Sequence, residues 1–217
     1  MEPAEAFKLG FLTSVVGIPL RGVELMNLVG KHATGAFATA LDAQINGFRA
    51  RNAQTVENVQ LVEGILAKHG LPKFPRPQTF DDWVTWSGQA SQSAGGLVPA
   101  DSAAAAALIA GAYFGDLLAA VQLAQILVGL LPDEPGNQEL AVQIAGHLGY
   151  AARAAKHIDL VLRHPALSAK AKPPLAAAVA AYRGVAIDAM PAAECHEALV
   201  KLRAQINSQG PALASAF

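Results

Sequence analysis

The chain has 217 residues, a formal net charge of −1, 53% hydrophobic residues and 15% charged residues. This length allows one domain with a substantial buried core. The near-neutral charge argues against a nucleic-acid-binding protein, because phosphate recognition needs a concentrated basic surface. The low charged fraction predicts shared apolar surface, so we expect a homo-oligomer, most simply a homodimer.

The first residues and the cysteine content predict a cytoplasmic protein. Glu2 and Glu5 stand where a secretory signal would carry basic residues, and no cleavage pattern follows the short apolar run after them. Cys195 is the single cysteine, so the chain cannot form an internal disulfide or a metal site of thiolates alone. Its register with Leu199 and Leu202 on one apolar stripe favours a buried structural thiol.

The first half of the chain predicts four helices before its centre. A helix is expected from Pro3 to about Val16, ended by Gly17-Ile18-Pro19, because proline disfavours helix in the residue before it. We interpret this helix as a small arm. Apolar residues spaced three or four apart then predict one long amphipathic helix over residues 21–49. A third helix is expected over 55–69, with Gly70 placed as a left-handed C-cap.

A proline-rich stretch over 71–78 predicts extended chain before the next helix. Thr79, with Asp82 three residues on, is typical of an N-cap that opens a helix ending at 95–96. Trp83 and Trp86 lie three residues apart on it. Such a stripe usually packs against a neighbouring element. A ligand platform is the alternative, so both tryptophans are ligand-binding candidates.

The segment from Asp101 to Leu131 organises the prediction, because it is helix-forming throughout. Ser102 can cap it, Pro132 ends it, and Asp116 is the one charge between those two ends. A helix that is apolar all round is either the core of a globule or a membrane span. Asp116 near the middle would cost about 2.5–3.5 kcal/mol in a membrane. We therefore expect a buried central helix.

A helix from Asn137 to about His164 should follow and form an antiparallel hairpin with the central helix. Basic side chains crowd one of its faces: Arg153, Lys156, His157, Arg163 and His164. The simplest interpretation of this face is a solvated surface, and an anion site is the alternative. Two shorter helices are predicted to begin at Pro173-Pro174 and at Pro191.

Asp116 is the residue that most favours a functional site. A lone acid in an apolar helix must be hydrogen-bonded, paired or protonated. Tyr113 lies three residues earlier on the same face, and Arg153 or His147 could reach Asp116 from the following helix. Asp116 could therefore be a structural tie to Arg153, or an acid or base acting with Tyr113 and either His147 or His157. The ligand-binding candidates are Tyr113, Asp116, Arg153, Trp83 and Trp86.

Known catalytic and metal-binding motifs do not occur in the sequence. None of the histidines has a glutamate three residues before it, and no two histidines are four residues apart. His157 and His164 share a helix face two turns apart, but no acidic residue on that face completes a metal site. No glycine-rich phosphate loop or serine elbow occurs. We predict no metal site, and the sequence leaves any cofactor unknown.

The periodicities predict an all-α fold, a single domain over residues 1–217 with about six to eight helices around the helix at about 102–131. We expect a non-catalytic bundle that binds an apolar small molecule or a partner helix. One alternative is an enzyme that performs acid/base chemistry on an apolar substrate at Asp116. Another is a membrane- or lipid-surface-associated protein. The alanine-rich amphipathic helices resemble those of granule-coating phasins, and an apolar helix wrapped by amphipathic ones resembles pore-forming helical domains.

Overall fold

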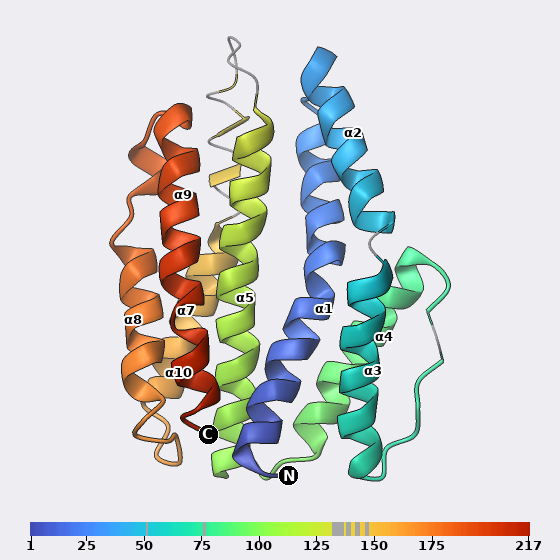
Figure 1. The fold of residues 1–217 in the computed structure, drawn as a ribbon, viewed down its shortest axis with the longest axis vertical. Helices are drawn as coiled ribbons and strands as arrows, with labels where there is room; N and C mark the ends of the chain where they lie inside the picture. Colours follow the sequence, from blue (N-terminus) through green and yellow to red (C-terminus); the bar gives the residue numbers. More distant parts are fainter. Residues whose placement is uncertain (51, 76, 132–136, 138–139, 142–143, 146–147) are drawn as a thin grey trace.

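The fold was described from a computed structural model, which describes the chain except residues 51, 76, 132–136, 138–139, 142–143 and 146–147 (Figure 1). The described residues form helices and contain no strand, so the predicted all-α fold is confirmed. The α-helices are α1 (Pro3–Gly30), α2 (Gly35–Ala50), α3 (Asn52–Lys68), α4 (Phe80–Gly96), α5 (Ala103–Leu130), α7 (Gly149–Leu162), α8 (Lys172–Arg183), α9 (Ala192–Asn207) and α10 (Gly210–Ala214).

Helix α5 is the predicted central helix. Its N-cap is Ser102, whose hydroxyl accepts a hydrogen bond from the Ala105 amide at 3.0 Å. Phe114 and Leu123, which lie on opposite sides of the helix, are both buried. Figure 1 shows α5 between α1 on one side and the helices α7 and α9 on the other. The bundle is therefore organised around this element.

Helix α1 corrects the prediction for the first fifty residues. It continues through Gly17 and Pro19 to Gly30, and non-helical residues 31–34 separate it from α2. The expected arm that ends at about Val16 and the expected single helix over 21–49 are therefore wrong. A proline inside a helix removes one hydrogen bond and costs about 3 kcal/mol. Burial of Val16 and Met26 on either side of Pro19 supplies the compensating stability. Helix α1 is a second core helix.

Helices α1 and α5 run parallel and pack more extensively than any other pair (Figure 1). They meet at Gly10 and Gly111, where the two backbones touch. A Cβ atom on Gly10 would lie 2.1 Å from the Leu108 carbonyl oxygen, and one on Gly111 would lie 2.2 Å from the Phe7 carbonyl oxygen. This reciprocal contact resembles the packing through small residues four apart that is common between membrane helices. Among the described helices, the most extensive contact of α5 is therefore with α1 and not with the helices that follow it.

Two predicted helix ends are confirmed by their capping geometry. Gly70 has φ +80° and follows α3, and the Leu71 amide donates to the Leu66 carbonyl at 3.2 Å. Thr79 and Asp82 form a reciprocal capping box at the start of α4.

At the end of α3, His69 Nε2 lies 2.8 Å from Glu5 Oε2 of α1. The hydrogen bonds from His69 and Lys68 hold the pKa of the Glu5 carboxyl below its usual value.

The second half differs from prediction mainly before α7. A turn at Leu148 interrupts the expected 137–164 helix, and α7 begins only at Gly149. Helices α8 and α9 begin at the predicted prolines. Cys195 is buried, as expected. The C-terminus docks on the bundle, because the ring of Phe217 stacks on Phe7 of α1 at 5.0 Å.

Candidate functional site

A pocket of about 480 Å³ lies between four helices of the bundle. Its floor is the crossing of α1 and α5, and its walls are α4 on one side and α7 on the other. Most of its lining atoms are apolar. The lining residues are Gly10, Thr13, Ser91, Ala94, Gly95, Leu108, Ile109, Ala112, Tyr113, His157, Leu160, Val161 and His164.

The close crossing of α1 and α5 explains why a pocket forms here. The floor contains Gly10, which has no side chain, and Ala112, which has only a methyl group. Ala94 and Gly95 leave the α4 wall equally free of large side chains. Small residues let backbones approach but leave little side-chain volume above them. The Thr13 hydroxyl donates its hydrogen bond within its own helix, where Oγ1 lies 3.0 Å from the Leu9 carbonyl oxygen and 2.9 Å from the Gly10 carbonyl oxygen. The floor therefore presents an apolar surface to the pocket.

Tyr113 and His157 form the aromatic part of the wall. Their ring centroids are 4.3 Å apart and the ring planes differ by 9°, so the rings are stacked. Both side chains are half-buried and line the pocket. Within the described part of the chain, no protein group hydrogen-bonds the Tyr113 hydroxyl or the His157 ring nitrogens. These atoms are available to a bound molecule.

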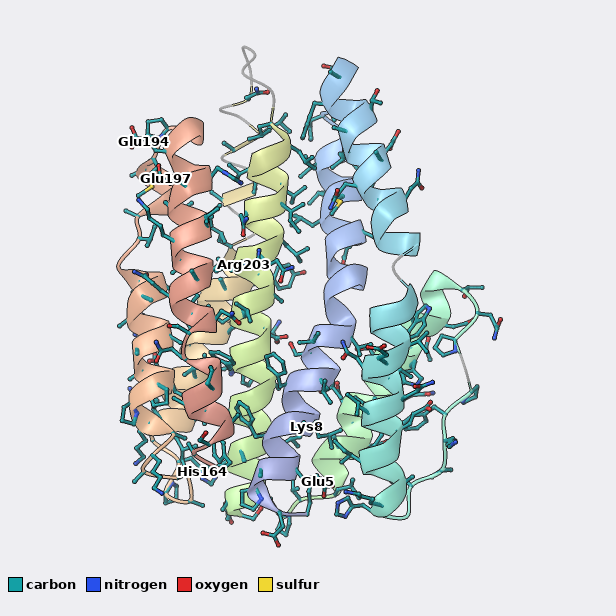
Figure 2. All side chains as sticks on the ribbon, viewed as in Figure 1. Glu5, Lys8, His164, Glu194, Glu197 and Arg203 are labelled. Atoms are coloured by element: carbon teal, nitrogen blue, oxygen red, sulfur yellow. The ribbon has the colours of Figure 1, made fainter. Side chains whose placement is uncertain are left out.

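His164 stands at the end of the same wall, just beyond α7, and Figure 2 places it near the end of the bundle where the N-terminus lies. Its Nδ1 accepts a hydrogen bond from the Ala166 amide at 3.2 Å. An accepting Nδ1 carries no hydrogen, so the ring hydrogen of this tautomer is on Nε2. His164 therefore offers one donor, for which the described residues supply no acceptor.

Asp116 lies on the same face of α5 but borders a different and much smaller pocket. That pocket holds about 20 Å³ and is lined by apolar residues together with Tyr150. The space suffices for one water molecule and not for a substrate. The Ser14 hydroxyl of α1 donates a hydrogen bond to Asp116 Oδ1. Asp116 is therefore tied across the crossing of α1 and α5.

The structure brings together only some of the residues singled out in the sequence. Tyr113 and His157 meet, as the acid/base hypothesis required, but they line the larger pocket while Asp116 borders the smaller one. Arg153 is exposed on α7 and forms no ion pair with Asp116. His147 lies outside the described residues. Whether Asp116 has a catalytic role stays a prediction.

The two tryptophans lie away from both pockets, in an aromatic cluster with Phe74. Trp86 is 1% exposed, and its ring meets Trp83 edge-on with centroids 6.3 Å apart. Phe74 meets Trp86 at 90° with centroids 6.5 Å apart. Packing by these rings holds Phe74 against α4.

His164 was predicted only as part of the basic face, whose alternative interpretation was an anion site, and Ile109 and Leu160 were missed as lining residues. The signal for His164 was its seven-residue spacing from His157, which places both on one face of a helix. The signal for Leu160 was its position between them, where it remains 54% exposed. Among the described residues, no three or more histidine, cysteine, aspartate or glutamate side chains lie together as metal ligands would.

Comparison of the chain with protein-family models, with curated proteins and with solved structures finds no match. The function must therefore be inferred from the geometry.

Proposed function

We propose that the protein binds an apolar small molecule in the pocket between α1, α4, α5 and α7. The observation that supports this proposal is the pocket itself, about 480 Å³ in volume and lined mostly by apolar atoms. Ligand sites are typically about 300–1,000 Å³, mostly apolar, and contain a few polar groups that orient the ligand. Tyr113, His157 and His164 are such groups here.

The exposure of two apolar lining side chains also favours a ligand site over a space that is merely left by imperfect packing of the core. Ile109 of α5 and Leu160 of α7 both line the pocket and are 37% and 54% exposed. Large apolar side chains left exposed in a pocket gain free energy when a ligand covers them. A bound apolar molecule would cover both, which supplies binding energy without a change in the fold.

Filling the pocket tests this proposal. Ala112→Phe adds a ring at the pocket floor, where the present side chain leaves space. We expect this variant to lose at least about tenfold in affinity for Nile red, a neutral apolar dye, because the ring occupies the volume the dye needs. Fluorescence titration measures the affinity. Native mass spectrometry of freshly purified protein should also reveal a co-purified molecule in the unsubstituted chain.

Ala152→Phe is the matched control, because Ala152 is exposed on α7 and does not line the pocket. Its dye affinity should equal that of the unsubstituted protein. Thermal melts of both variants show whether the fold is retained. Equal dye affinity in all three proteins would contradict the proposal.

Membrane insertion is the second candidate function, and the composition of α1 and α5 favours it. Both helices are long and apolar enough to cross a membrane, with mean hydropathies of 1.4 and 1.8 over their most apolar stretches. Those stretches are 79% and 67% buried in the bundle, which is also what core helices of a globule show. Insertion would require the pair to leave the bundle and carry Asp116 into the lipid.

Dye release from vesicles separates this candidate from the first. Acidic solution neutralises carboxylates in general and so lowers the cost of carrying acidic side chains into lipid. If the bundle inserts, vesicles of anionic lipid should release an encapsulated dye at about pH 4 and much less at about pH 7. Absence of release at both pH values would discard the candidate. An Asp116→Asn variant should release dye at about pH 7 as well, because its side chain is always neutral.

A further inference from the structure

We infer that the molecule bound in the large pocket is a carboxylic acid with an apolar chain, and that His164 Nε2–H receives its carboxylate. This inference rests on the proposed ligand-binding function. It adds the chemical class of the ligand and the residue that selects it.

The first observation is the tautomer of His164. Because Nδ1 accepts from the Ala166 amide at 3.2 Å, the hydrogen on Nε2 makes that nitrogen a donor. A ligand group that pairs with it must be a hydrogen-bond acceptor. The Ala166 contact also fixes the orientation of the ring, so little side-chain freedom is lost when a ligand binds.

The second observation is the distribution of charge around this wall. The described pocket lining contains no aspartate or glutamate. Arg153 and Lys156 are exposed on α7, and Arg163 is exposed at the residue that follows it. The nearby acid of α7, Asp159, is engaged by Arg183 of α8. No carboxylate of the described residues pairs with these three cations, so this part of the chain is net positive.

The end of α7 also carries a negative partial charge, which disfavours an anion. The helix dipole is equivalent to about half an elementary charge at this end. Lys156 and Arg163 directly precede the lining residues His157 and His164 in the sequence, and each carries a full positive charge. Two full charges exceed this partial charge, so a carboxylate is favoured over an amine.

The third observation is the apolar remainder of the pocket. Leu108, Ile109 and Val161 line it together with the small residues of α1 and α4. An alkyl chain can lie over this surface while its carboxylate stays at the histidine end. The ligand is thus amphipathic, with one anionic group and one apolar body.

Calorimetric titration with dodecanoate, dodecan-1-ol and dodecylamine, each below its micellar concentration, tests the inference. We expect dodecanoate to bind at least about tenfold more tightly than the alcohol, and the amine most weakly. His164→Phe should weaken dodecanoate binding about tenfold. His164→Gln keeps an N–H donor and should restore much of the dodecanoate affinity.

His32→Phe is the control, because His32 is exposed in the turn after α1 and far from the pocket lining. It should bind all probes as the unsubstituted chain does. Equal affinity for the acid and the alcohol, with no effect of His164→Phe, would overturn the inference while bound Nile red still supported an apolar pocket. Failure of every probe, Nile red included, would overturn both the inference and the proposed function.

Discussion

Gly111→Ala should unfold this protein at a markedly lower temperature, because the added methyl group has no space. Its Cβ would lie 2.2 Å from the Phe7 carbonyl oxygen and 3.0 Å from the Phe11 amide nitrogen. Backbone atoms cannot turn away as a flexible side chain can, so α1 and α5 must separate along their main contact. We expect a loss of about 3 kcal/mol, which lowers the melting temperature by about 6–12 °C in a chain of this size.

Gly64→Ala provides the matched control for this substitution. Gly64 lies within α3, and a Cβ atom there would meet no atom within 4 Å. The change should stabilise the protein by about 0.5–1 kcal/mol, because alanine loses less backbone entropy in a helix. Gly10→Ala should behave like Gly111→Ala, since its Cβ would lie 2.1 Å from the Leu108 carbonyl oxygen. Equal melting temperatures for Gly111→Ala and the unsubstituted chain would show that α1 and α5 do not cross here.

The helix ends that are capped by residues close to them in the sequence could be predicted. Ser102, the Thr79 capping box and Gly70 all stand where the local rules placed them. Each depends on hydrogen bonds between residues a few positions apart, so a short stretch of sequence contains the whole interaction. Helix α5 was also predictable, because its apolar character extends over its full length.

The course of α1 was not predictable from the same rules. Proline at position 19 predicts a helix end from local rules, yet buried residues lie on both sides of it in one continuous helix: Val16 before it, and Val23, Met26 and Val29 after it. Those contacts are made with distant parts of the chain, and tertiary packing outweighed local propensity. The spacing of Gly10 and Ser14, matched by that of Gly111 and Gly115, was the available signal that the two helices meet.

The candidate site was predictable only in part, because a pocket is a property of several helices at once. Tyr113 and His157 were chosen for their helical register and do meet in a stack. Asp116 has the same register on α5, yet the neighbouring helices divide that face into two pockets. Register fixes which face a residue occupies, but only the packing of α4 and α7 decides what lies opposite it.

Trp86→Ala should be the most destabilising single truncation in the aromatic cluster. The side chain is 1% exposed and contacts the rings of Phe74 and Trp83. Removing a buried tryptophan ring costs about 3–5 kcal/mol, through lost burial and the cavity left behind. A denaturant titration should show this loss as a lower midpoint. Nile red affinity should not change in the protein that remains folded, because the cluster lies away from the large pocket.

Two further variants separate the contribution of ring packing from that of the indole N–H. The Trp86 Nε1 atom is buried and lacks a hydrogen-bond partner among the described residues. Trp86→Phe removes this unsatisfied donor, whose burial costs about 1–3 kcal/mol, and keeps most of the ring contacts. It should therefore cost far less than Trp86→Ala. Trp83→Ala should also cost less, because Trp83 is only half-buried. If Trp86→Phe proved as damaging as Trp86→Ala, the N–H would have to be satisfied in solution by a group that holds the cluster together, and ring packing would not be its main source of stability.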